Sequence, residues 1–255
     1  MPEVTASHYR PGMPCWVDLM VPDQQAAIDF YRDLFGWQGE IGPPEVGGYA
    51  TCTLNGKPVA GIMKAQPMNG GGLPAWTTYL ASTKVDATQA AITRAGGSVT
   101  APAMDVATLG RMLVALDPTG AAIGVWQPIE FYGAQVVNEP GALAWNELRT
   151  SDIDSAVSFY KEAFSLGSSE TESDYYVLTV DDLPAGGITN MEGTPSGAAS
   201  HWLPYFAVTD TDSTVDALLR AGGRVITPAS DGPQGRTAVV ADPQGAVFTV
   251  ISLTE

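Results

Sequence analysis

Histidine, cysteine and basic residues are scarce in this sequence, and each shortage narrows the possible functions. The 255 residues include two histidines, His8 and His201, and no HxxxH, HxxE or CxxC spacing. Sites for catalytic iron, nickel or zinc typically use two or more imidazoles, so we expect no native catalytic metal. Cys15 and Cys52 are interpreted as small core residues, because a chain of this length can form its core without a disulfide.

The charge balance excludes further classes of partner. Twelve Lys and Arg residues stand against 28 Asp and Glu residues, which gives a formal net charge of −16. Such a chain repels polyphosphates and anionic lipid surfaces, so nucleic acid and membranes are not expected partners. No apolar run approaches the roughly 20 residues of a membrane span, and the N-terminus lacks the order of a signal peptide. These features favour a cytoplasmic protein.

Cofactor and nucleophile motifs are missing as well. The sequence contains no GxGxxG or Walker-type loop, and no Ser/His/Asp set can be assembled from it. We therefore expect no cofactor.

An internal repeat dominates what is present. The stretch CWVDL at 15–19 returns as AWNEL at 144–148, and FY at 30–31 returns at 159–160. Further along, AGGSV at 95–99 matches AGGRV at 221–225, and DPTG at 117–120 matches DPQG at 242–245. Four landmarks in the same order indicate one unit duplicated.

Each half divides again into two similar quarters. After a strand at the start, residues 24–35 place Ala27, Phe30, Tyr31 and Leu34 on one helical face, with Asp23 as the N-cap. In the second quarter a helix over 85–94 ends at Gly96 and Gly97, and three apolar strands follow. The pattern predicts an α+β fold of four βαβββ units in two tandem domains, 1–130 and 131–255. Gly- and Pro-rich linkers are expected at 70–74, 133–141 and 193–197.

The duplicated βαβββ unit, the FY pair, the AGG helix stop and the DPxG turn together resemble the vicinal oxygen chelate superfamily of glyoxalases, bleomycin-resistance proteins and extradiol dioxygenases. The tandem form is similar to actinobacterial members such as a mycobacterial antigen and the glyoxalase-like "hydroxylases" of polyketide gene clusters. The resemblance implies metal-ligand positions on the first and last strand of each unit. In this sequence they fall on residues unsuited to hold a divalent metal: Trp16, Gly61, Thr77 and Gly124 in the first half, and Trp145, Gly187, Leu203 and Thr249 in the second.

Strand alternation and the register implied by the resemblance predict which side chains share a site. The candidate catalytic residues are Asp18, Glu147, Tyr79 and Tyr205. The candidate ligand-binding residues are Trp16, Thr77, Trp126, Trp145 and His201. The first domain is expected to carry the more aromatic of the two sites.

Each candidate also has a purely structural interpretation. Trp16 and Trp145 fill the core equally well. Asp18 and Glu147 are costly to bury without a partner, and Glu147 has a salt bridge to Arg149 or Arg111 as the alternative to a ligand role. Tyr79 and Tyr205 also suit ordinary strand positions, and His201 suits a partly exposed strand start.

The expected function is metal-independent binding of a hydrophobic aromatic metabolite, extending to tailoring chemistry, in secondary metabolism or resistance. A bound phenol or ketone also allows proton transfer by a carboxylate whose pKa is raised. The alternatives are a glyoxalase- or dioxygenase-type enzyme that uses Asp18 or Glu147 in an unusual metal set, and a non-catalytic protein whose clefts are filled by its own side chains. Both monomer and homodimer agree with the sequence.

Overall fold

The structure, a computed structural model, describes residues 9–65, 73–172, 174–192, 194 and 197–253. The first half contains β1 (Pro14–Val21), α1 (Gln24–Phe35), the 3-10 helix η1 (Pro44–Val46), β2 (Ala50–Leu54), β3 (Lys57–Lys64), β4 (Ala75–Ala81), α2 (Val85–Arg94), β5 (Ser98–Val106), β6 (Gly110–Leu116) and β7 (Ala122–Pro128). The second half contains β8 (Leu143–Arg149), α3 (Ile153–Phe164), β9 (Gly167–Glu172), β10 (Tyr175–Val180), β11 (Leu183–Thr189), β12 (His201–Ala207), α4 (Thr211–Arg220), β13 (Arg224–Gly232), β14 (Gly235–Ala241) and β15 (Val247–Leu253).

Each half of the chain forms one mixed sheet. The first has the order β2-β3-β1-β4-β7-β6-β5, and the second has the order β13-β14-β15-β12-β8-β11-β10-β9. In both sheets the two unit-starting strands pair antiparallel at the centre, β1 with β4 and β8 with β12. The last strand of each unit lies parallel beside them. The predicted α+β fold of two tandem glyoxalase-like domains is confirmed.

Helix α1 follows from its sequence as predicted. The Asp23 side chain accepts a hydrogen bond from the Ala26 amide at 3.0 Å, which satisfies one of the unpaired donors of the first turn. Gly36 ends the helix in a left-handed conformation with φ of 78°. Its buried face includes Phe30 and Tyr31, so the first copy of the FY motif is core, and the second copy in α3 is buried in the same way.

The first unit departs from the expected βαβββ pattern. After α1 the chain makes only an isolated bridge between Gln38 and Thr53, where the other three units have a full strand. Residues 39–44 read GEIGPP, and proline and glycine weaken a strand because they remove a ladder donor and a packing side chain. This is why the first sheet has one strand fewer than the second.

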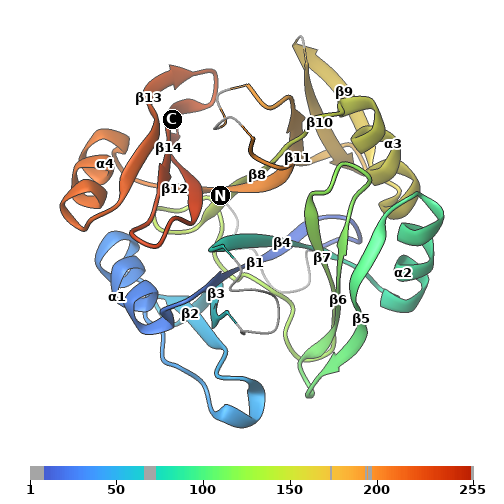
Figure 1. The fold of residues 1–255 in the computed structure, drawn as a ribbon, viewed down its shortest axis with the longest axis horizontal. Helices are drawn as coiled ribbons and strands as arrows, with labels where there is room; N and C mark the ends of the chain where they lie inside the picture. The colour runs from blue at the N-terminus through green and yellow to red at the C-terminus, as the bar shows by residue number, and fades with distance from the viewer. Residues whose placement is uncertain (1–8, 66–72, 173, 193, 195–196, 254–255) are drawn as a thin grey trace.

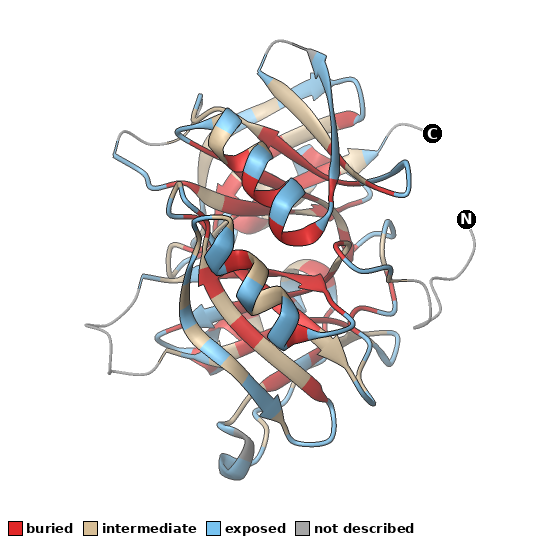
Figure 2. Ribbon diagram, turned by 90° about the vertical axis from the view of Figure 1, so that its right-hand side faces the viewer, coloured by how far each residue is buried: buried red, intermediate tan, exposed pale blue. Residues whose placement is uncertain are grey.

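The helices pack in pairs between the two halves. Figure 1 shows α1 beside α4 on one side of the molecule and α2 beside α3 on the other, and Figure 2 shows the buried residues on the helix faces that meet the strands. One core cluster joins the first unit to the fourth, for example Tyr31 with Phe206 and Phe248. The other joins the second unit to the third.

The repeated motifs meet across the two halves. The Tyr31 hydroxyl of the first FY donates to Asp242 of the second DPxG turn at 3.2 Å, and the Tyr160 hydroxyl of the second FY donates to Asp117 of the first turn at 3.1 Å. Both tyrosines are fully buried. These two contacts are reciprocal, and they tie each domain to the other.

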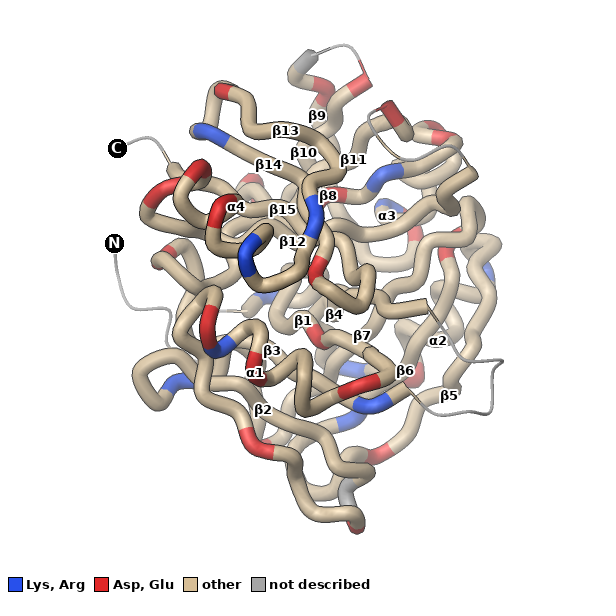
Figure 3. Tube along the Cα trace, turned by 60° about the vertical axis from the view of Figure 1, so that its left-hand side comes forward, with Lys and Arg blue, Asp and Glu red and all other residues tan. Residues whose placement is uncertain are grey.

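Acidic positions lie mainly along the helices and at the turns between strands (Figure 3). Among the described residues, no helix is long and apolar enough to cross a membrane. The expected linkers at 70–74 and 193–197 lie partly outside the described residues. His8 lies outside them.

Candidate functional site

The register of the first sheet brings four of the predicted site residues to its centre. Trp16 on β1 lies opposite Tyr79 on β4, and Asp18 lies opposite Thr77. Because neighbouring strand residues point to opposite faces, Trp16 and Asp18 share one face while Val17 and Leu19 enter the helix-covered core. Trp126 on β7 joins Trp16 and Tyr79 in one apolar cluster.

Two glycines make room for tyrosine rings at the same place. Gly61 is paired with Asp18 and Gly124 with Tyr79. A Cβ atom at Gly61 would overlap the Tyr49 hydroxyl, and a Cβ at Gly124 would overlap the Tyr79 ring. A longer side chain at either position therefore requires the tyrosine to move.

Asp18 sits in a short chain of hydrogen bonds. The Trp16 indole N–H donates to the Tyr49 hydroxyl at 2.7 Å, and that hydroxyl donates to Asp18 Oδ2 at 3.4 Å. Asp18 is 5% exposed. Burial raises the pKa of its carboxyl to about 7, while hydrogen bonds from Tyr79 and Tyr49 oppose the rise.

A residue from the connection between the halves closes this first cluster. The Phe131 ring meets the Trp16 ring edge-on with centroids 4.9 Å apart, and its carbonyl accepts from the Trp126 indole N–H at 2.7 Å. Trp16, Tyr79 and Trp126 are all less than 10% exposed. The first site is strongly aromatic, and the chain's own Phe131 packs against it.

The second sheet repeats the arrangement with a more polar centre. Trp145 lies opposite Tyr205, and Glu147 lies between Leu203 and Gly187 on the neighbouring strands. The Trp145 indole N–H donates to the Tyr175 hydroxyl at 3.2 Å, which matches the bond between Trp16 and Tyr49.

Glu147 forms an ion pair with Arg149, with 2.6 Å between Oε1 and Nε. The two residues lie two apart on β8 and so point to the same face. Arg111, the other partner considered for Glu147, instead forms ion pairs with Asp86 and Asp105. Burial and the nearby Glu147 raise the pKa values of Tyr175 and Tyr205, so both phenols keep their protons at neutral pH.

Most polar groups of this second cluster have a partner, and the Arg149 guanidinium also donates to the Glu192 carbonyl at 2.7 Å. The hydroxyl of Thr249, which is paired with Tyr205, is buried without a hydrogen-bond partner among the described residues. The Glu147–Arg149 contact is close, but its atoms lack hydrogen-bond alignment. Trp145, Tyr175 and Tyr205 are only partly buried, in contrast to the tryptophans of the first cluster. Buried polar groups of this kind normally have partners, which makes this face a candidate ligand site.

His201 stands at the margin of the second cluster. It is paired with Arg149 across β12 and β8, and its Nδ1 lies 2.8 Å from the Ala199 carbonyl oxygen. The ring is only partly buried. This geometry matches a strand-start residue more closely than a general base.

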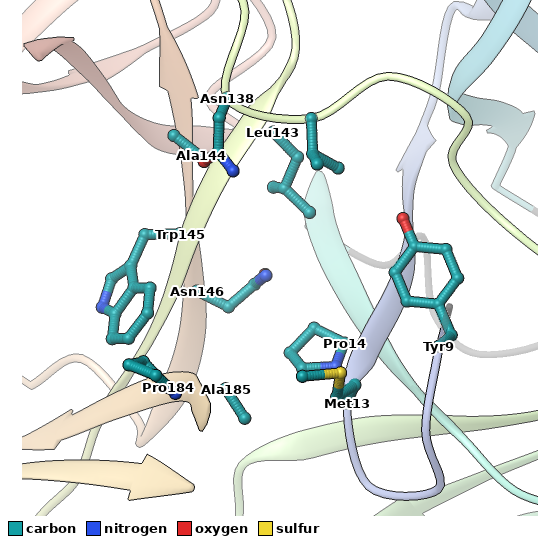
Figure 4. Close-up of a pocket in the computed structure, with 11 residues that line it drawn as sticks. Tyr9, Met13, Pro14, Asn138, Leu143, Ala144, Trp145, Asn146, Pro184 and Ala185 are labelled. Atoms are coloured by element: carbon teal, nitrogen blue, oxygen red, sulfur yellow. The ribbon is translucent and has the colours of Figure 1, made fainter. Parts of the chain in front are cut away.

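A pocket of about 460 Å³ lies beside Trp145, between the two halves. Figure 4 shows Trp145 on one wall, Pro184 and Ala185 below it, and Tyr9, Met13 and Pro14 on the opposite wall. Sequence reasoning did not anticipate this pocket. Tyr49 and Tyr175 were also missed. Tyr49 directly precedes β2 and Tyr175 begins β10, so an alignment of the two halves exposes this repeated tyrosine.

Comparisons with known proteins identify the family of this chain. The profile of the Glyoxalase/Bleomycin resistance protein/Dioxygenase superfamily matches residues 14–125 and 142–250. The chain belongs to this superfamily.

Two groups of relatives match this chain over nearly its whole length. CFP32 of Mycobacterium bovis, whose name assigns it provisionally to the glyoxylases, is 45% identical, with 96% of each chain covered. The anthracycline biosynthesis protein DauV of Streptomyces sp. strain C5 is 38% identical over 98% of this chain and 96% of its own. DnrV of Streptomyces peucetius, named in the same way, is also 38% identical with the same coverage.

Solved structures of superfamily enzymes share the fold. The Mn(II)-bound glyoxalase of Novosphingobium aromaticivorans has a TM-score of 0.67 at 17% identity, covering 96% of this chain and 83% of its own. The 2,3-dioxygenase LapB of Pseudomonas sp. KL28 has a TM-score of 0.67 at 13% identity, covering 98% of this chain and 94% of its own.

The residues at the centre of each sheet do not fit the divalent metal that superfamily enzymes of this kind hold. Each cluster offers one carboxylate, and that of the second cluster is already paired with Arg149. Across the part of the chain that the structure describes, no three His, Cys, Asp or Glu side chains lie close enough together to hold a metal ion. Tyrosine rings fill the space beside Gly61 and Gly124, where a further donor would need to stand.

Proposed function

We propose that this superfamily member binds a flat, hydrophobic aromatic molecule without a metal ion. It then acts as a tailoring or accessory factor in the biosynthesis of such molecules, or as a resistance protein. The observation that carries the proposal is the second cluster, where the rings of Trp145, Tyr175 and Tyr205 are partly exposed. The same cluster holds the Glu147–Arg149 ion pair and the Thr249 hydroxyl, which is buried without a partner among the described residues. Aromatic walls with a few convergent polar groups are typical of small-molecule sites.

The polar groups of the second cluster suit a hydroxyl or carbonyl on the edge of the ligand. The protonated phenol of Tyr205 and the Arg149 guanidinium act as donors, and the Glu147 carboxylate acts as an acceptor. The buried hydroxyl of Thr249 can donate or accept a hydrogen bond. A ligand oxygen at this position gives the buried Thr249 hydroxyl a partner, and this selects against molecules without such an oxygen.

The relatives support the chemical class. DauV and DnrV carry names from anthracycline biosynthesis, and they match this chain end to end. The glyoxylase name of CFP32 points to a different reaction. The residues present favour a role in such biosynthesis, because no group of described side chains in this chain suits a metal ion, whereas the glyoxalase of Novosphingobium aromaticivorans binds Mn(II).

The test is a calorimetric titration with a flat, uncharged hydroxyanthraquinone, before and after EDTA treatment. We expect binding that EDTA leaves unchanged. Tyr205→Phe and Glu147→Gln are each expected to weaken binding by about three- to tenfold, the value of one or two net hydrogen bonds. Tyr176→Phe is the matched control, since Tyr176 packs against the helix-covered core and not the second cluster.

Two results would count against the proposal. The absence of any binding to the anthraquinone would contradict it directly. An EDTA-sensitive activity on a catechol or on the methylglyoxal–glutathione adduct would establish the metal-dependent alternative instead.

Asp18 favours a second candidate function, proton-transfer catalysis on a bound phenol or ketone. Its pKa of about 7 matches the requirement for a general base that works near neutral pH. The checking measurement is deuterium exchange, followed by NMR, at the carbon next to the carbonyl of a bound aromatic ketone. Catalysed exchange that disappears in Asp18→Asn and persists in Tyr205→Phe would assign the reaction to the first cluster. No catalysed exchange would exclude it for that ketone.

A further inference from the structure

One position of the repeat is filled by protein in the first half, and the equivalent position is open in the second half. In the first half, the connection between the halves runs beside the start of β1 and β3. The Ala134 amide donates to the Cys15 carbonyl at 2.8 Å, and the Gln135 amide donates to the Pro58 carbonyl at 2.8 Å. The Phe131 ring, from the same segment, packs edge-on against Trp16.

The repeat locates the corresponding place in the second half. Strand β8 aligns with β1 and strand β11 with β3, because Glu147 pairs with Gly187 as Asp18 pairs with Gly61. Cys15 and Trp16 therefore correspond to Ala144 and Trp145, and Pro58 corresponds to Pro184. The residues Ala144, Trp145 and Pro184 line the 460 Å³ pocket. The pocket thus opens where residues 131–135 lie in the first half.

Sequence differences between the halves enlarge the pocket and add one polar side chain to its wall. Val59, which is buried in the first half, is replaced by Ala185, and Val17 is replaced by Asn146. Asn146 Oδ1 accepts from the Thr78 hydroxyl at 2.8 Å, and its amide nitrogen points into the pocket (Figure 4). A buried amide in place of valine is costly unless its donors find partners.

The chemistry of the walls selects the ligand. Among the described residues that line the pocket, none is Asp, Glu, Lys or Arg, so an ion would enter without a countercharge from them. Trp145 and Tyr9 face the space from opposite sides, and Met13 lies beside Pro14 on the far wall. The volume lies within the range of roughly 300 to 1,000 Å³ that is usual for small-molecule sites.

We propose that this pocket between the halves is the place where the body of the aromatic ligand binds. A flat, uncharged ring system packs against Trp145 as Phe131 packs against Trp16, and an oxygen on its edge accepts a hydrogen bond from the Asn146 amide. This inference rests on the proposed function and assigns a position to its ligand. Trp145 belongs both to the pocket and to the second cluster, so a ring that packs against it lies next to both.

Three variants test the location with the same hydroxyanthraquinone. Asn146→Val and Ala185→Val restore the first-half residues, and Ala144→Phe fills the pocket with a ring. We expect about a tenfold weaker affinity for Ala144→Phe and a several-fold weaker affinity for the two valine variants. Leu183→Ala is the control. Leu183 lies on β11 like Ala185, but it is 46% exposed and does not line the pocket. Thermal unfolding of each variant verifies that the fold is intact.

The outcomes separate the location from the function. Weakened binding in the folded pocket variants, with Leu183→Ala unchanged, supports the inference. Unchanged binding in all three, together with loss of affinity in Tyr205→Phe and Glu147→Gln, overturns the location and leaves the proposed function standing. The absence of binding to the wild-type chain overturns both.

A chain that lacks residues 1–8 completes the test. A large gain in affinity on this truncation would mean that the N-terminal segment, and not a small molecule, is the natural occupant.

Discussion

At the scale of single residues, the face of each side chain was predictable and its partner was not. Strand alternation correctly placed Trp16 and Asp18 on one face, with Tyr79 beside them. Tyr49, which hydrogen-bonds to both Trp16 and Asp18, lies just before β2 and more than 30 residues away in sequence, so the alternation along β1 cannot reveal it. The same holds for Phe131, which lies outside every predicted element.

Asp18 gives a prediction about stability and pH. Its pKa in the folded chain is about 7, against 3.8 as the ordinary value, so between these pH values the folded state binds more protons than the unfolded state. Stability is therefore lost as pH rises from about 4 to about 7, by an amount of the order of a few kcal/mol. We expect Asp18→Asn to be more stable than wild type at pH 8, with the advantage shrinking toward pH 4. Urea unfolding across this range measures the difference, and a difference independent of pH would contradict the assignment to Asp18.

At the scale of helices and strands, periodicity and capping residues were sufficient for most elements. The helix at 24–35 begins after Asp23 and ends before Gly36, as its sequence indicates. The sequence did not predict that the first unit lacks a strand. The other three units follow the full βαβββ pattern, so the same pattern was expected here. The local glycine and proline content of residues 39–44 overrides that expectation.

The packing of strand β3 against Tyr49 provides an element-scale test. A methyl group at Gly61 overlaps the Tyr49 hydroxyl, so Gly61→Ala is expected to destabilise the fold by about 1 to 3 kcal/mol. In the background of Tyr49→Leu the same change is expected to cost much less, because the hydroxyl is gone. A double-mutant cycle by urea unfolding measures the coupling. Additive effects of the two changes would show that the overlap is relieved elsewhere.

At the scale of the whole molecule, the repeat itself limited the prediction. Each half has one FY pair in its first helix and one DPxG turn, so the sequence cannot distinguish contacts within a half from contacts between halves. The structure chooses the second arrangement, Tyr31 with Asp242 and Tyr160 with Asp117. Both core clusters contain residues from both halves for the same reason.

This interleaving predicts that the chain unfolds as one unit. We expect a single transition in urea, seen equally by tryptophan fluorescence and circular dichroism. Tyr31→Phe and Tyr160→Phe are each expected to lower the free energy of unfolding by about 1 to 3 kcal/mol, since each removes the hydroxyl that donates to Oδ2 of a buried aspartate, while Oδ1 keeps its backbone donors. Two separate transitions, with each variant affecting only one, would contradict the interleaved core.

The Phe131 segment makes two equivalent halves unequal. A duplicated protein would ordinarily be expected to take up two ligands, one for each copy. Here the connection between the copies already occupies the place in the first half, with its own aromatic ring against Trp16. With the ligand placed as we propose, the segment that joins the repeats takes the position of a second ligand, and we expect one ligand to bind per chain.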